Sequence, residues 1–257
     1  MHFIAVECFD HRYFWQDEKT KRCHYTCGLA REGGATAIRK VTPDKFLSDT
    51  WLNALDAFED NPVVVGFIVE QTCLSAISSH GFNIRRLHWK PLKPKIFDGD
   101  ILDAISLEAS QALYIPDRWN YKDIDALYLC IDKQKKTVLI VPIQISINPL
   151  HKDSEACFYA DWERWVKRFK GYTLSSTFVW IVEHDRSWKI VDEQSRDLRG
   201  GMQSIVPLHE QMHVTVVDVY RPLGERLAQA RQRGRSLCPE LTFSSDVRSR
   251  ATEFQDD

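Results

Sequence analysis

The segment TVLIVPIQIS, at residues 137–146, constrains the fold more than any other part of the sequence. Because alternate side chains of a strand share a face, Leu139, Val141, Ile143 and Ile145 point one way. The opposite face holds Val138, Ile140, Pro142, Gln144 and Ser146. That second face begins apolar and ends in two hydrogen-bonding side chains. Either the strand leaves its sheet at this point, or it delivers Gln144 and Ser146 to a site.

The elements around this strand predict an α/β domain with a mixed sheet flanked by helices. A helix is expected at 61–80, because Asn61 suits the N-cap, Pro62 suits the first helical position and Gly81 suits the end. The tetrad KQKK directly before residue 137 indicates a hairpin. The remaining predicted elements are strands at 111–116, 124–132, 177–183 and 213–220 and an amphipathic helix at 153–171. The apolar stripe of that second helix consists of Ala156, Tyr159, Trp162, Val166 and Phe169.

We expect three regions along the chain. Residues 1–60 form a helical lead-in, in which Thr42 and Pro43 begin a helix. Residues 61–240 form the main domain, and the polar residues 241–257 form a loose tail. A length of 257 residues is enough to bury a sizeable core.

Composition limits the location and the partners of the protein. There is no signal-peptide core after Met1 and no apolar run of bilayer length, so we expect no membrane partner. Seven cysteines without regular spacing indicate reduced thiols and an intracellular location. Cys23, His24 and Cys27 lack the second ligand pair of a zinc finger, so no zinc site is expected.

Basic residues gather in two stretches, although the formal net charge of −2 predicts no strong overall attraction to nucleic acid. The first stretch holds Arg85, Arg86, Lys90, Lys93 and Lys95, and the second holds Arg221, Arg226, Arg231, Arg233 and Arg235. Such runs are often plain solvated surfaces. The functional alternative is a surface that contacts the phosphates of nucleic acid.

An acidic residue interrupts the apolar stripe of the helix expected at 61–80. At 100° per residue, Glu70 falls in the sector of Val63, Phe67, Leu74 and Ile77. A charged carboxylate in a core costs several kcal/mol unless something compensates it. An ion pair, a raised pKa and a bound metal ion are all open interpretations of Glu70.

Further acidic residues precede the strand expected at 124–132. Asp117, Asp123 and Asp125 lie there, and Asp123 and Asp125 share a face. The hairpin then brings Gln144 and Ser146 beside that strand, and His151 and Lys152 follow it in the chain. Carboxylate and amide oxygens that converge suit a hard cation such as Mg²⁺ or Mn²⁺. A metal held there could activate water and stabilise the charge on a phosphodiester.

The chain resembles a known family at this point. The order of helix acid, strand aspartate and a following polar strand resembles the PD-(D/E)xK core of restriction endonucleases. Three stretches resemble the Crinkler effectors and the retrotransposon hot spot (RHS) proteins. They are DHRYFWQDEKTKRCHYTCGLARE, VGFIVEQTCLSAISSHGF, and ALYIP…N…IDALYL followed by IQIS…HK.

The resemblance implies a nuclease-like effector domain that acts on DNA inside host cells, in the nucleus. It implies that Glu70 is the helix acid and Asp125 the strand acid, and that Gln144 and Ser146 stand at the glutamate and lysine positions. The metal ligands would then be Glu70, Asp125 and Gln144. Such a domain usually follows a P-loop ATPase, but this chain contains no G-x-x-x-x-G-K-[ST] motif.

Two departures from the family pattern leave alternatives open. Gln144 offers a neutral oxygen in place of an anion, and Ser146 lacks the cation of a lysine. His151 or Lys152 could substitute as a base or a phosphate contact. The chain is therefore either a metal-dependent nuclease or a degenerate restriction-fold module that binds nucleic acid or a host protein. A third interpretation is an interaction domain whose apolar helix forms a homo-oligomer interface.

Overall fold

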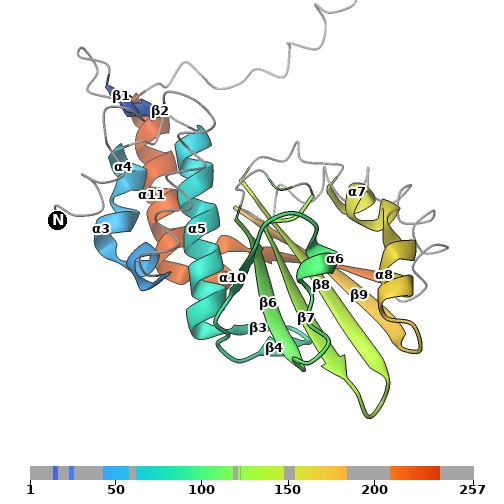
Figure 1. Ribbon diagram of the computed structural model, residues 1–257. Helices are drawn as coiled ribbons and strands as arrows, with labels where there is room; N and C mark the ends of the chain where they lie inside the picture. Colours follow the sequence, from blue (N-terminus) through green and yellow to red (C-terminus); the bar gives the residue numbers. More distant parts are fainter. Residues whose placement is uncertain are drawn as a thin grey trace, which may run out of the picture.

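The computed structural model describes residues 14–16, 23–25, 43–57, 62–117, 121, 123–147, 154–183 and 209–237. These residues form a six-stranded mixed sheet flanked by helices (Figure 1). The sheet consists of β5 (Lys95–Phe97), β6 (Gln111–Pro116), β7 (Ala126–Asp132), β8 (Thr137–Ser146), β9 (Thr173–Val182) and β10 (His209–Thr215). Two small antiparallel pairs join β1 (Phe14–Gln16) to β2 (Cys23–Tyr25) and β3 (Phe82–Ile84) to β4 (Leu87–Trp89).

The strand order across the sheet is β10-β9-β8-β7-β6-β5. β6, β7 and β8 form an antiparallel meander, and β9 lies parallel to β8. The connection from β8 to β9 contains the helices α7 (Ser154–Ala160) and α8 (Trp162–Arg168). β10 and β5 extend the two edges, each parallel to its neighbour. The predicted α/β class with a mixed sheet and flanking helices is confirmed.

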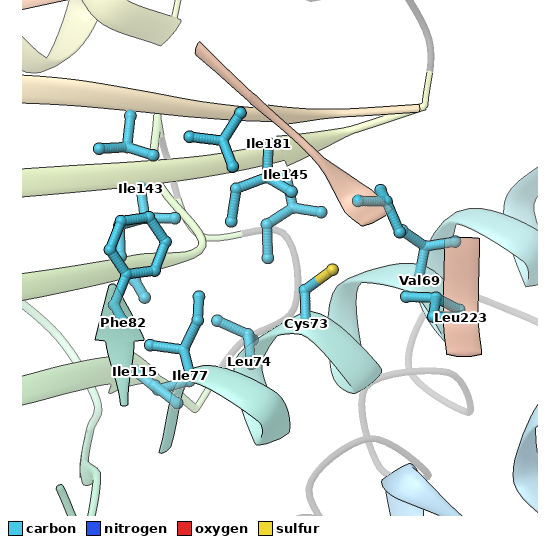
Figure 2. Packing of buried hydrophobic residues seen from close by; sticks show 14 of the residues in the cluster. Val69, Cys73, Leu74, Ile77, Phe82, Ile115, Ile143, Ile145, Ile181 and Leu223 are labelled. Atoms are coloured by element: carbon cyan, nitrogen blue, oxygen red, sulfur yellow. The ribbon is translucent and has the colours of Figure 1, made fainter. Parts of the chain in front are cut away.

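One face of the sheet packs against α5 (Pro62–His80), which lies between the sheet and a second group of helices (Figure 1). Every residue from 67 to 78 is buried, because α5 has neighbours on all sides. Its outer neighbours are η1 (Pro43–Leu47), α3 (Asp49–Leu52), α4 (Ala54–Ala57), α10 (Val216–Val219) and α11 (Arg221–Leu237). Figure 2 shows side chains of α5, such as Cys73 and Leu74, among aliphatic residues of the sheet.

The opposite face carries an aromatic core under α6 (Ile101–Ala104), α7 and α8. Its members include Tyr114, Phe158, Tyr159, Trp162, Trp165, Phe169, Phe178 and Trp180. The predicted stripe of the helix at 153–171 is correct for Tyr159 and Trp162, which are buried, and wrong for Val166, which is 51% exposed. The helix breaks at Asp161, where α8 begins on a new axis, and this break turns Val166 outward.

Several predicted elements are confirmed within the described residues. α5 begins at Pro62 and ends before Gly81, and β8 has the expected bounds. Gly81 has φ 78°, and a Cβ there would lie 2.3 Å from the carbonyl oxygen of Trp89. Glycine is therefore required where the chain turns from α5 into the β3–β4 hairpin. The hairpin expected at KQKK joins β7 to β8.

Other elements differ from the prediction. The helix expected from Thr42 is divided, because Ser48 caps a new helix through its hydroxyl and the Trp51 N–H. Thr42, Asn61 and the tail at 241–257 lie outside the described residues. The strand expected at 213–220 ends at Thr215, whose capping box with Asp218 starts α10. α11 was not predicted at all.

The lead-in belongs to the same core as the sheet. Leu52 and Leu55 are buried in one cluster with α5 and β8. The Trp51 indole N–H donates to the hydroxyl of Thr72 on α5 at 2.9 Å. Residues 14–16 and 23–25 form the strands β1 and β2, where only helix was expected. Within the described part of the chain, no helix has both the length and the apolar character needed to span a membrane.

Candidate functional site

Asp125 lies at the fork where β7 and β8 separate. The ladder between these strands ends at the pair Ala126 and Ile143, and the Asp125 N–H then donates to the Ile143 carbonyl at 2.9 Å. Beyond it, Oδ2 of Asp125 accepts the Ile145 N–H at 2.6 Å. A side-chain carboxylate thus continues the ladder where the backbone of β7 departs. Two residues earlier, Asp123 has φ 74°, a left-handed conformation that Asp tolerates better than most residues.

Glu70 lies on α5 and is 9% exposed. Its Oε1 accepts a hydrogen bond from Nε2 of Gln71 at 2.9 Å, and Gln71 is also buried. This bond lowers the cost of placing a carboxylate in the α5 layer. This hydrogen bond is neither an ion pair, nor a raised pKa, nor a bound metal ion, because its donor is a neutral amide.

Glu70 and Asp125 lie in one region of the structure, because both carboxylates affect the pKa of the same side chain, Cys73 on α5. The pKa of the Cys73 thiol lies far above its ordinary value, first because the side chain is fully buried and then because of the charges on Asp125 and Glu70. Both carboxylates therefore act on a single thiol between α5 and the sheet. The thiol stays protonated at neutral pH.

Gln144 and Ser146 point the other way. Val141, Ile143 and Ile145 pack with α5, so alternation places Gln144 and Ser146 on the face of α7 and α8. Their neighbours on β9 are Trp180 and Val182, which belong to the aromatic core. Gln144 is half-buried and Ser146 is buried.

Asp125 is the residue that connects the two faces. By register its backbone lies opposite Gln144, while its charge reaches Cys73 beside α5. His151 and Lys152, expected to complete the site from the following loop, lie outside the described residues. Asp117, a further acid considered from the sequence, directly follows β6 and donates its N–H to the Phe97 carbonyl at 2.7 Å.

The described residues do not fit a complete Mg²⁺ or Mn²⁺ site. Across the described ranges, no three His, Cys, Asp or Glu side chains gather closely enough to hold a metal ion. One oxygen of Asp125 is already bonded to a backbone N–H, and the amide of Gln144 lies on the face away from α5. A hard cation prefers six or more oxygens, many of them anionic. Glu70 and Asp125 alone supply too few.

The first basic stretch is solvent-exposed. Its members Arg85, Arg86, Lys90, Lys93 and Lys95 lie on the β3–β4 hairpin, on the segment after it and at the start of β5. Arg86 forms an ion pair with Glu210 on β10. The ammonium of Lys95 lies 5.5 Å from the ring centre of Tyr114. Lys90 and Lys93 form no ion pair within the described part of the chain.

The second basic stretch lies on α11 and is turned toward carboxylates of the same chain. Nε and Nη2 of Arg231 each lie 3.2 Å from an oxygen of Glu183. Arg226, at 3.3 Å, and Arg233 both bind the carboxylate of Asp56 on α4. These bonds attach α11 to the rest of the fold and neutralise part of its charge. Less of that charge is available to phosphates than the sequence indicated.

A buried polar network on the α7 side was missed in the sequence. Nε2 of His209 lies 2.6 Å from Oε1 of Glu155, and Nε2 of Gln211 donates to the other oxygen of Glu155 at 2.8 Å. Beside this pair, the hydroxyls of Tyr159 and Ser176 lie 2.7 Å apart. Ser176 in turn donates to the Ile140 carbonyl at 2.9 Å, which commits its proton and makes it unsuitable as a nucleophile.

A signal for this network was present in the sequence. Glu155 precedes Tyr159 by one helical turn, so it shares the apolar stripe of the helix at 153–171. Its partner His209 lies just before the strand expected at 213–220, and could not be paired with it from local pattern. No family model, curated protein or solved structure matches the chain. Function must therefore be inferred from the element order and the side chains described above.

Proposed function

We propose that the chain is a restriction-endonuclease-like module, of the kind found in Crinkler and RHS effectors, that binds DNA inside host cells, in the nucleus. The observation that carries the proposal is the fork at Asp125. At this point β7, the middle strand of the meander, separates from the segment Gln144–Ser146 of β8. The order of helix α5, strands β6 to β8, helices α7 and α8, and strand β9 supports this proposal.

Binding without cleavage fits the side chains best. The positions that would hold a metal-binding glutamate and a catalytic lysine hold Gln144 and Ser146, and both lie on the face away from α5. The exposed cations of the first basic stretch supply contacts to phosphates. Such contacts release counterions and give affinity without chemistry.

Fluorescence anisotropy with a labelled DNA duplex tests this proposal. The wild type should bind, and the logarithm of its affinity should fall linearly with the logarithm of the salt concentration. Lys90→Glu combined with Lys93→Glu should weaken binding, whereas the matched control Lys45→Glu, exposed on η1, should not. Absence of binding at low salt would reject the proposal.

Metal-dependent cleavage of DNA is the second candidate, favoured by the proximity of Glu70 and Asp125 to one thiol. Calorimetric titration of the wild type with Mg²⁺ or Mn²⁺ tests it, together with a cleavage assay on linear DNA. Asp125→Ala should abolish both signals if this candidate is correct. Asp125→Asn keeps an oxygen that can accept the Ile145 N–H, and so controls for damage to the fold.

A further inference from the structure

A groove between α6 and α8 carries cations that the sequence did not single out. It has a volume of about 660 Å³ and is lined by Leu102, Asp103, Arg164, Lys167 and Arg168. This size falls in the range of sites for small molecules, roughly 300–1,000 Å³. The groove lies on the aromatic face of the sheet, and none of its lining residues belongs to either basic stretch considered above.

Both guanidinium groups of the groove are held in place. Arg164 pairs with Asp161, at 3.7 Å, and with Asp100, whose Oδ1 also caps α6 by accepting the Leu102 N–H at 2.9 Å. Partial burial raises the pKa of Asp100, but the bonds from Arg164 and the Leu102 N–H outweigh it and leave that pKa below its ordinary value. Nη2 of Arg168 donates to the Ile105 carbonyl at 2.7 Å. A guanidinium fixed by one partner keeps other N–H groups available in a defined direction.

Two of the three cations have no anion of their own. In the part of the chain that the structure describes, Lys167 and Arg168 form no salt bridge with a carboxylate. The arginines of α11 provide a contrast, since three of them bind Asp56 or Glu183. The positive charge of Lys167 and Arg168 favours an external anion in the groove. Asp103 at its edge can accept a hydrogen bond from a hydroxyl or amino group of the same ligand.

We propose that the groove between α6 and α8 is a phosphate-binding site that takes a phosphate of the DNA backbone. The choice of DNA rests on the function proposed above, whereas the phosphate chemistry rests on the three cations alone. A phosphate would lie between Lys167 and Arg168, with Arg164 as a further donor. The buried side chain of Leu102 forms the apolar floor of the groove.

The alternative is that these cations only complement the C-terminal end of α8. Lys167 and Arg168 lie in its last turn, where positive charge is favourable without any ligand. Lys170, two residues past the end of α8, is exposed but does not line the groove. Lys167 and Lys170 therefore form a matched pair that differs in access to the groove.

Anisotropy with a labelled duplex on the wild type, Lys167→Ala and Lys170→Ala tests the site. The slope of log affinity against log salt should fall by about 1 for Lys167→Ala and stay unchanged for Lys170→Ala. Equal losses in both variants, or no loss in either, would overturn the groove as the site. If DNA binding then still depends on Lys90 and Lys93, the proposed function stands without the groove.

Calorimetric titration with adenosine monophosphate separates the two sources of phosphate. Binding to the wild type that Lys167→Ala weakens severalfold, in a protein that does not bind the duplex, would establish the groove as a site for free nucleotides and reject the DNA-binding function. Absence of binding to both the duplex and the nucleotide would overturn the site. Arg168→Lys is unsuitable as the main variant, because Arg168 also holds the Ile105 carbonyl.

Discussion

The two faces of the sheet treat buried polar groups differently. On the aromatic face, the carboxylate of Glu155 on α7 lies between His209 and Gln211, at the start of β10. At the end of the β7–β8 ladder, the carboxylate of Asp125 bonds to the backbone of β8, and its charge reaches Cys73 on α5. A network enclosed by side chains is a structural device. Asp125 precedes β7 at the edge where the parallel strands β8 and β9 have their carboxyl ends, which is where α/β sheets usually bind ligands.

The distinction teaches how to rank candidate site residues in this protein. Glu155 and His209 look catalytic by type, but they are enclosed by Tyr159 and their own partners. Asp125 lies at the end of the β7–β8 ladder, and its charge acts on the Cys73 thiol between α5 and the sheet. The most informative changes are those that affect one face and leave the other intact.

The largest expected effect is on stability, from Glu155→Ala. This change leaves the buried His209 and the half-buried Gln211 without their shared acceptor, and breaking a buried pair in this way costs about 3–5 kcal/mol. Denaturant unfolding followed by tryptophan fluorescence measures it. Glu155→Gln retains a hydrogen-bonding group and should cost clearly less. If both variants unfold like the wild type, the network does not stabilise the fold.

Asp125→Ala should destabilise the protein by about 1–3 kcal/mol, because the Ile145 N–H loses its acceptor beside the buried sheet. Asp125→Asn should recover most of this loss. Unfolding midpoints in urea measure both variants. A wild-type midpoint for Asp125→Ala would mean that the fork is not held by this bond, and would weaken the contrast between the two faces.

The double substitution Gln144→Glu and Ser146→Lys restores the two residue types of the family pattern, glutamate and lysine. We expect no metal-dependent cleavage from this double variant, because both new side chains lie on the aromatic face and Glu70 lies on the other. A correctly placed group would contribute about 3 kcal/mol to the transition state, near a hundredfold in rate. A gain of that size with Mg²⁺ in a DNA cleavage assay would contradict the assignment of faces.

The smallest effect concerns Cys73 and alkaline pH. Burial and the two nearby carboxylates raise the pKa of its thiol in the folded state, so its contribution to stability is complete below the unfolded pKa of about 8.5. Above that value the free energy of unfolding should fall by about 1.4 kcal/mol per pH unit from this group. Cys73→Ala should remove this part of the slope in unfolding measurements between pH 8 and pH 10. An unchanged slope would mean that the pKa of the Cys73 thiol is not raised in the folded state.

The local sequence pattern predicted the central elements well, because the residues within each element are enough to determine its type and its bounds. β8 and α5 carry long apolar runs with clear stop signals, and both have the expected bounds. α11 was overlooked because five arginines dominate it, although Leu223, Leu227 and Ala230 repeat at helical spacing and are buried.

The candidate site was harder to predict. The alternation of side chains along β8 places Gln144 and Ile143 on opposite faces of the sheet. It does not indicate which helix covers which face. That choice depends on packing between distant segments. The same limit applies to Arg231 and Arg233, whose carboxylate partners on other elements decide how much charge remains at the surface.

The attachment of α11 to Asp56 has a consequence for biosynthesis. Asp56 and Arg226 are separated by 170 residues, and Val69 of α5 packs with Leu223 near the start of α11 (Figure 2). A ribosome therefore completes the entire sheet before it supplies the last cover of its most apolar helix. Contacts of such long range slow folding and expose apolar surface in the meantime. The nascent chain should need protection from aggregation until α11 emerges.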